Sequence, residues 1–166
     1  PVERRPGSGK PAQQRTPMRV ALAHLVQNPS LAPSVPDTGA FEGCDLPGIE
    51  IYLELVDFCA RSPNMTTAQL LEGWHEHPAH SHLDTLATWR LPGEDAQRAQ
   101  EFRDAVVRLE LQWIEAQISR MPKIVELATE DRRRLVALQQ RRQVLIAALK
   151  DGDGEGEQSN ETSSPI

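Results

Sequence analysis

The spacing of large apolar residues after Glu94 constrains the fold most strongly. These residues follow one another in steps of four and three: Phe102, Val106, Leu109, Trp113 and Ala116. Such spacing places them on one face of an α-helix, with carboxylates and arginines on the other. If the helix is continuous to Met121, it is roughly 40 Å long at about 1.5 Å per residue. Pro122 must end or kink it, because proline removes a backbone donor and clashes with the preceding turn.

A second amphipathic pattern follows Pro122. Thr129 is suited to cap a helix, and Glu130 and Asp131 lie in the first turn, where carboxylates are favourable. The apolar stripe of this helix consists of Leu135, Leu138, Leu145 and Leu149. The two patterns together predict a helical hairpin that ends near Lys150.

Shorter helices are predicted before this hairpin. Proline suits the first turn of an amphipathic segment at 17–27, and Asn28 is expected to cap a further helix that begins at Pro29. After a loop rich in turn residues, Gly48 or Asp45 opens the next helix. These short segments separated by proline and glycine are typical of a compact helical bundle.

The remaining bundle helices follow in quick succession. The segment 49–60 has the most apolar pattern, so we expect it to be the central helix. Thr66 and Gln69 have the spacing of a capping box in front of another helix. Proline interrupts the histidine-rich stretch at 75–82, and a last short helix is predicted around 83–89.

These patterns predict an all-α fold, a compact bundle of short helices followed by a long helix and a C-terminal helical hairpin. The bundle spans 16–93 and the hairpin 94–150. Residues 1–15 are rich in proline, glycine and arginine, and we expect a flexible linker from an absent catalytic region. Residues 151–166 alternate acids with glycine and are expected to form a disordered acidic tail.

Composition excludes several classes of protein. Apolar residues make up 39% of the chain but aromatic residues only 4%, so the core must be largely aliphatic. The net charge of −6 argues against direct nucleic-acid binding. The chain lacks both the roughly 18 consecutive apolar residues of a membrane span and the pattern of a signal peptide, so we expect a cytoplasmic protein that does not bind membranes. Cys44 and Cys59 are expected to remain free thiols.

The chain shows no pattern of a catalytic site. We find no phosphate-binding glycine loop, no nucleophile elbow and no carboxylate cluster for two metal ions, so no catalytic or cofactor-binding residue is predicted. Close-spaced imidazoles are good zinc or nickel ligands, and four occur here: His75, His77, His80 and His82. Without a nearby cysteine an exposed turn is the simpler interpretation, so we predict no metal site, and a metal-binding module remains an alternative.

Three ordered segments resemble the carboxy-terminal helicase-binding domain of bacterial DNA primase. The first runs from Thr16-Pro17-Met18-Arg19 to Gln27-Asn28-Pro29, the second is Leu46-Pro47-Gly48, and the third is Thr66-Thr67-Ala68-Gln69-Leu70-Leu71. The resemblance covers about Thr16 to about Lys150. It implies a domain without its own chemistry that docks a primer-synthesising enzyme onto the hexameric replicative helicase.

The resemblance also implies which residues bind partners. The expected helicase anchors lie in the hairpin: Leu135, Leu138, Val144, Leu145 and Leu149. A second site would receive the acidic tail of single-stranded-DNA-binding protein, and its expected residues are Arg15, Met18, Arg19 and Leu22. The parent chain would be a DNA-directed RNA polymerase whose absent part holds zinc and magnesium. The domain alone is expected to be monomeric, and a free-standing helical adaptor is the alternative.

Overall fold

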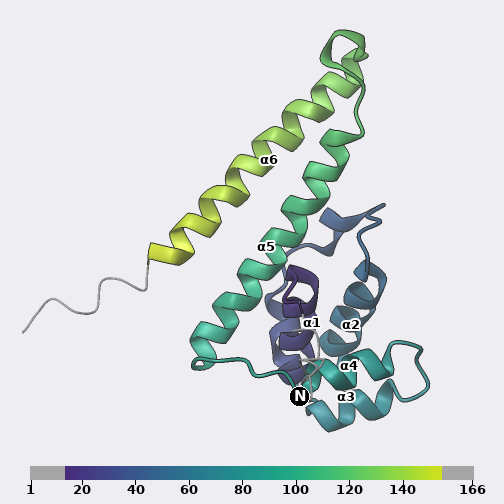
Figure 1. The fold of residues 1–166 in the computed structure, drawn as a ribbon, viewed down its shortest axis with the longest axis vertical. Coiled ribbons are helices and arrows are strands. Elements are labelled where there is room, and N and C mark those ends of the chain that lie inside the picture. Colours follow the sequence, from purple (N-terminus) through teal and green to yellow (C-terminus); the bar gives the residue numbers. More distant parts are fainter. Residues whose placement is uncertain (1–13, 155–166) are drawn as a thin grey trace, which may run out of the picture.

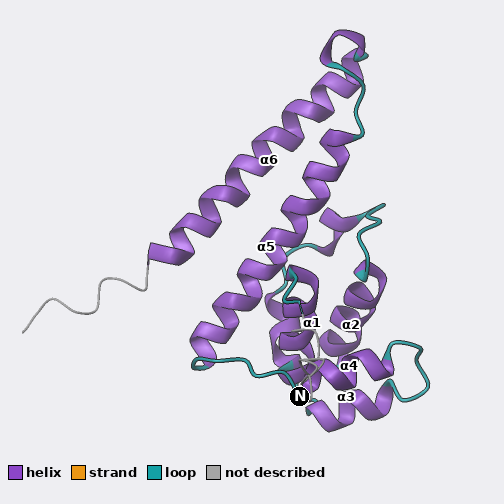
Figure 2. Ribbon diagram, in the orientation of Figure 1, coloured by secondary structure: helices purple, strands orange, loops and turns teal. Residues whose placement is uncertain are grey.

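The structure, a computed structural model, describes residues 14–154 and the side chains of 14–152. This part of the chain contains helices and loops but no strand (Figures 1 and 2). Its α-helices are α1 (Pro17–Gln27), α2 (Ile49–Arg61), α3 (Thr67–Gly73), α4 (His80–Ala87), α5 (Asp95–Ser119) and α6 (Thr129–Gly154). Its 3₁₀ helices are η1 (Pro29–Ser34), η2 (Thr38–Phe41) and η3 (Ile124–Glu126). The predicted all-α fold with long final helices is confirmed.

Helix α1 lies at the centre of the bundle, where it contacts α2, α3, α4, α5 and η1. Its fully buried residues include Ala21, Leu22, Ala23, Leu25 and Val26. The expectation that the segment 49–60 is central was wrong. Helix α2 carries exposed carboxylates along one side, which must stay hydrated, whereas the small alanines of α1 let neighbours approach it from several directions.

Local signals at the helix starts have the predicted geometry. The Thr16 hydroxyl accepts a hydrogen bond from the Arg19 amide at 3.3 Å, with Pro17 in the first turn. Gly48 precedes α2 with φ of 87°, a left-handed conformation that favours glycine. In the capping box of α3, Thr66 and Gln69 each accept a bond from the other's backbone amide, at 3.2 and 2.9 Å.

Three helix boundaries differ from the expectation. The segment after Asn28 forms the 3₁₀ helix η1, because Pro33 has no N–H with which to continue an α-helical ladder. Helix α5 ends at Ser119, before Met121. Thr129 is the first helical residue of α6, not its cap, and the preceding residue's carbonyl already accepts the Arg132 amide at 3.0 Å.

Helix α5 belongs to both parts of the molecule. Phe102, Ala105, Val106 and Leu109 lie in the bundle core beside α1, whereas Trp113 and Ile114 are buried nearer the hairpin end. The hairpin of α5 and α6 projects beyond the bundle (Figure 1). An ion pair of 2.8 Å between Arg120 and Asp45 joins the end of α5 to the loop before α2.

Helix α6 continues to Gly154, past the expected end at Lys150. Its last turn lies against α5, since a β-carbon added at Gly152 would be 3.0 Å from Nε2 of Gln100. The predicted linker and acidic tail fall mostly on 1–13 and 155–166, outside the described residues, and the boundary at 93/94 stays a prediction. Within residues 14–154, none of the helices has the length and apolarity to cross a membrane.

Candidate functional site

Polar pairs fix the register of the hairpin. Arg141 donates from Nε and Nη2 to the two carboxylate oxygens of Glu110, at 2.6 and 3.0 Å. Nearer the tip, Arg134 donates to Gln117 at 2.9 Å. The Glu110 side chain is only 10% exposed, and its hydrogen bond raises the pKa of Arg141. Because these pairs follow an antiparallel order, they hold α6 on α5 between Arg134 and Arg141.

Most of the predicted helicase anchors face α5 instead of solvent. Leu145 is buried, and the other leucines of the stripe are half-buried: Leu135, Leu138 and Leu149. Their spacing is that of a seam between two packed helices. Val144 is the exposed member of the predicted set. The structure therefore brings four of the five residues together as the inner face of the hairpin.

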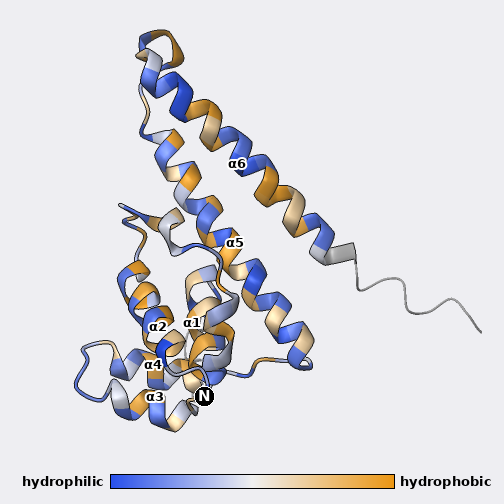
Figure 3. Ribbon diagram, turned by 180° about the vertical axis from the view of Figure 1, so that it is seen from behind, coloured by the Kyte–Doolittle hydropathy of each residue, from blue (hydrophilic) through white to orange (hydrophobic). Residues whose placement is uncertain are grey.

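The most exposed large apolar side chains lie at the hairpin tip. Ile124 is 70% and Val125 91% exposed, both in η3 between α5 and α6. Figure 3 shows hydrophobic colour at this tip and along α6. Val136 of α6 is also exposed. We name Ile124, Val125, Val136 and Val144 the outer apolar surface. Ile124 and Val125 were not predicted from the sequence, although two β-branched residues in a short connection were an available signal.

The predicted acidic-tail site is divided by the structure. Met18 and Leu22 are buried in the bundle core, and Met18 packs against the backbone at Gly48. They therefore provide no exposed apolar groove in this structure, and their role in binding an acidic tail stays a prediction. Arg15 and Arg19 remain at least partly exposed, as the charge of a guanidinium requires.

A small hollow lies beside Arg19 instead. Its volume is about 80 Å³, and it is lined by Arg19, His82, Thr85, Leu86 and Trp89. The Arg15 guanidinium lies 5.9 Å from the Trp89 ring centroid, within cation–π range. Burial and the nearby Arg19 lower the pKa of His82. The half-buried Trp89, just after α4, thus lies beside Arg15 and lines the hollow with Arg19, whereas Leu86 is buried like Met18 and Leu22.

A buried histidine joins the bundle to α5. His24 is 1% exposed, and its Nε2 lies 2.9 Å from Oε2 of Glu101. Glu101 also lies 3.6 Å from Arg15. Burial lowers the pKa of His24, although the bond to Glu101 opposes that shift. His24 was not predicted from the sequence, although it is one polar side chain inside the apolar run of 20–26.

Three other histidines lie in or next to the turn between α3 and α4. His77 accepts the Ala79 amide on Nδ1 at 3.0 Å, and its Nε2 lies 3.2 Å from Glu54. The rings of His75 and His80 are 5.9 Å apart. In the described part of the chain, no three histidine, cysteine, aspartate or glutamate side chains are grouped to hold a metal ion. Cys44 and Cys59 are free thiols.

Comparisons with known proteins agree on one family. The family model described as "DNA primase DnaG DnaB-binding" matches residues 18–138. The DNA primase of Salmonella typhimurium is 34% identical over 145 residues, which are 84% of this chain and 25% of that protein. The DNA primase of Pasteurella multocida is 36% identical over 105 residues, 63% of this chain and 18% of that protein.

A solved structure is similar over most of the fold. The DnaG primase C-terminal domain from Vibrio cholerae superposes with a TM-score of 0.63 at 35% sequence identity. The match covers 76% of this chain and 93% of that one. The chain spans a quarter or less of the length of the curated relatives named above.

Proposed function

The chain belongs to the DnaB-binding family of DnaG DNA primase domains, and on that premise we propose that it binds the replicative helicase through its hairpin. The observation that carries the proposal is the outer apolar surface, whose two tip residues are more exposed than any other large apolar side chain described. Ile124 and Val125 are adjacent, and contiguous exposed apolar side chains are typical of protein interaction sites. The amino-terminal domains of the helicase hexamer are the proposed partner.

The predicted anchors divide into two roles under this proposal. Leu135, Leu138, Leu145 and Leu149 hold α6 against α5 and so give the hairpin its shape. Val144 contacts the helicase together with the three other residues of the outer apolar surface. A rigid helix face with apolar anchors is a common way of docking one protein onto another.

The double substitution Ile124→Ser and Val125→Ser tests this proposal. It should weaken helicase binding by at least tenfold while leaving the unfolding transition unchanged, because solvated side chains contribute little to stability. Pro78→Ser is the matched control, an exposed apolar residue in the α3–α4 turn at the other end of the molecule (Figure 1). Equal binding by both variants would overturn the assignment of the tip.

We propose a secondary role for the surface at Arg15 and Arg19. The Arg15 guanidinium lies 5.9 Å from the Trp89 ring centroid, and Arg19 lines a small hollow with the same ring, a combination suited to an acidic peptide that ends in an apolar residue. The acidic tail of single-stranded-DNA-binding protein has this chemistry. Arg19→Gln should weaken binding of such a peptide roughly threefold or more, whereas Arg90→Gln should not. No difference between these variants would refute the site.

The whole protein's activity follows as a proposal from the family. The parent protein that contains this domain would synthesise short RNA primers on a DNA template, using zinc and magnesium held by its other parts. Docking would then place primer synthesis at the replication fork. The family match over residues 18–138 favours this role over that of a free-standing adaptor.

A further inference from the structure

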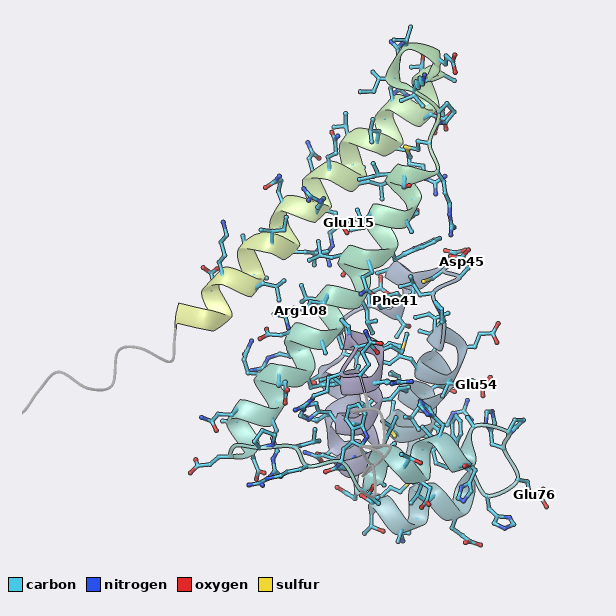
Figure 4. All side chains as sticks on the ribbon, in the orientation of Figure 1. Phe41, Asp45, Glu54, Glu76, Arg108 and Glu115 are labelled. Atoms are coloured by element: carbon cyan, nitrogen blue, oxygen red, sulfur yellow. The ribbon has the colours of Figure 1, made fainter. Side chains whose placement is uncertain are left out.

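One side of the bundle is built from a stretch of chain that contains carboxylates but no basic residue. Residues 31–60 contain no lysine, arginine or histidine, although the chain has 18 lysines and arginines in total. The same stretch contains six carboxylates: Asp37, Glu42, Asp45, Glu50, Glu54 and Asp57. It forms η1, η2 and α2, and Figure 4 shows Glu54 and Asp45 on this side of the molecule. Asp45, Glu54 and Asp57 pair with basic residues from outside the stretch. Asp37, Glu42 and Glu50 have no ion pair with a described residue, so a cationic partner would meet negative charge at these positions.

A groove runs through this acidic side. It has a volume of about 530 Å³ and lies between α2 and the connection that contains η1 and η2. Its apolar lining includes Pro33, Val35, Pro36, Leu53, Val56 and Ala60. Three of the carboxylates also line it, Asp37 and Glu42 on one wall and Asp57 on the other. No basic side chain is among the lining residues.

The carboxylates of the groove are only partly neutralised. Asp57 pairs with Arg61, and Asp37 accepts the amide of Gly39 at 2.8 Å. Glu42 is exposed, and its carboxylate has no hydrogen bond or ion pair with any described residue. The groove thus has an apolar floor and one wall that carries the unpaired carboxylate of Glu42, whereas Asp57 on the other wall is paired.

We propose that this groove binds a segment of a protein partner in which basic residues flank apolar side chains. Charge complementarity selects the cationic flanks, and the apolar lining accepts the side chains between them. The groove differs in charge from the surface at Arg15 and Arg19. The bundle therefore has two surfaces, which suit partner segments of opposite charge. This inference does not depend on helicase binding by the hairpin.

The probe is a nine-residue peptide with two leucines between pairs of arginines, carrying a fluorophore. Its binding to the full chain is measured by anisotropy and mapped by methyl chemical shifts of Leu53 and Val56. Glu42→Lys should weaken binding roughly fivefold or more, because it replaces an attraction with a repulsion. Glu76→Lys is the matched control, since it makes the same charge change in the α3–α4 turn, away from the groove (Figure 4).

A second pair of variants tests the groove's shape. Ala60→Phe fills the groove and should abolish saturable binding. Ala68→Phe adds the same ring at an exposed position of α3 and should leave binding unchanged. A peptide with serines in place of leucines should bind at least tenfold more weakly. The proposal fails if Glu42→Lys and Glu76→Lys weaken binding equally, since the attraction would then come only from net charge. It also fails if the serine peptide binds as well as the leucine peptide.

Discussion

Val144 and Leu145 are adjacent in the chain but lie in opposite environments, because Val144 is 57% exposed and Leu145 only 4%. Leu145 lines a pocket with Phe102 and Val106 of α5, where the hairpin meets the bundle. A predicted binding stripe therefore contains one residue that holds the hairpin together and one that is available to a partner.

Alanine substitutions at these two positions should separate stability from binding. Leu145→Ala removes buried methyl groups and should cost about 2–3 kcal/mol in urea unfolding followed by circular dichroism. Val144→Ala should change stability by less than about 0.5 kcal/mol. It should still weaken helicase binding. Equal losses of stability in the two variants would contradict the hairpin packing described here.

The ion pair between Arg141 and Glu110 should contribute measurably to stability. Arg141→Gln leaves the nearly buried Glu110 carboxylate without its two charged donors, so we expect a loss of about 1–3 kcal/mol. Arg142→Gln is the control. Arg142 lies 3.5 Å from the exposed Glu115 (Figure 4), and such a surface pair contributes little. Chemical unfolding of both variants checks the difference, and a larger loss for Arg142→Gln would be inconsistent with it.

His24 should make stability depend on pH. Burial lowers its pKa in the folded protein below 6.5, against the opposing effect of Glu101. The unfolded chain then binds more protons in the interval below 6.5, so stability is lost as pH falls through that interval. Nearby Arg15 and Arg98 act in the same direction as burial.

His24→Gln checks this effect. Unfolding free energies measured between about pH 7.5 and about pH 5.5 should vary less in the variant than in the original chain. His82, whose pKa is also lowered, should retain part of the dependence. An unchanged dependence in His24→Gln would remove His24 as its source.

The capping box of α3 should stabilise the bundle. Thr66→Ala removes the hydroxyl that accepts the Gln69 amide and should cost about 1 kcal/mol. Thr85→Ala is the control, because that hydroxyl donates to a carbonyl within its own helix and caps no free amide. Thermal unfolding of the two variants provides the comparison. A null effect at Thr66 would mean that water satisfies the amide equally well.

Much of the fold could be predicted because its signals are local. The Thr66 and Gln69 pair, Gly48 and Pro122 each determine a helix end within a few residues. The central position of α1 could not be predicted in that way, because it depends on contacts between distant segments. The bond between His24 and Glu101 is such a contact.

The candidate sites were harder to predict than the fold. Helical spacing places Leu135 and Val144 on different faces of one helix. Only the packing of α6 on α5 decides which of these faces stays exposed. Met18 and Leu22 were expected to line an exposed groove, but both side chains are buried in the core. The apolar residues at the tip lie outside a regular α-helix, where periodicity carries no information.

The most direct test of the central claim is a calorimetric titration of the replicative helicase hexamer with this chain. A second titration replaces the hexamer with the isolated amino-terminal domain of the helicase. We predict saturable binding to both, with the tip double variant Ile124→Ser and Val125→Ser binding at least tenfold more weakly. Absence of binding to the intact hexamer would contradict the proposed function.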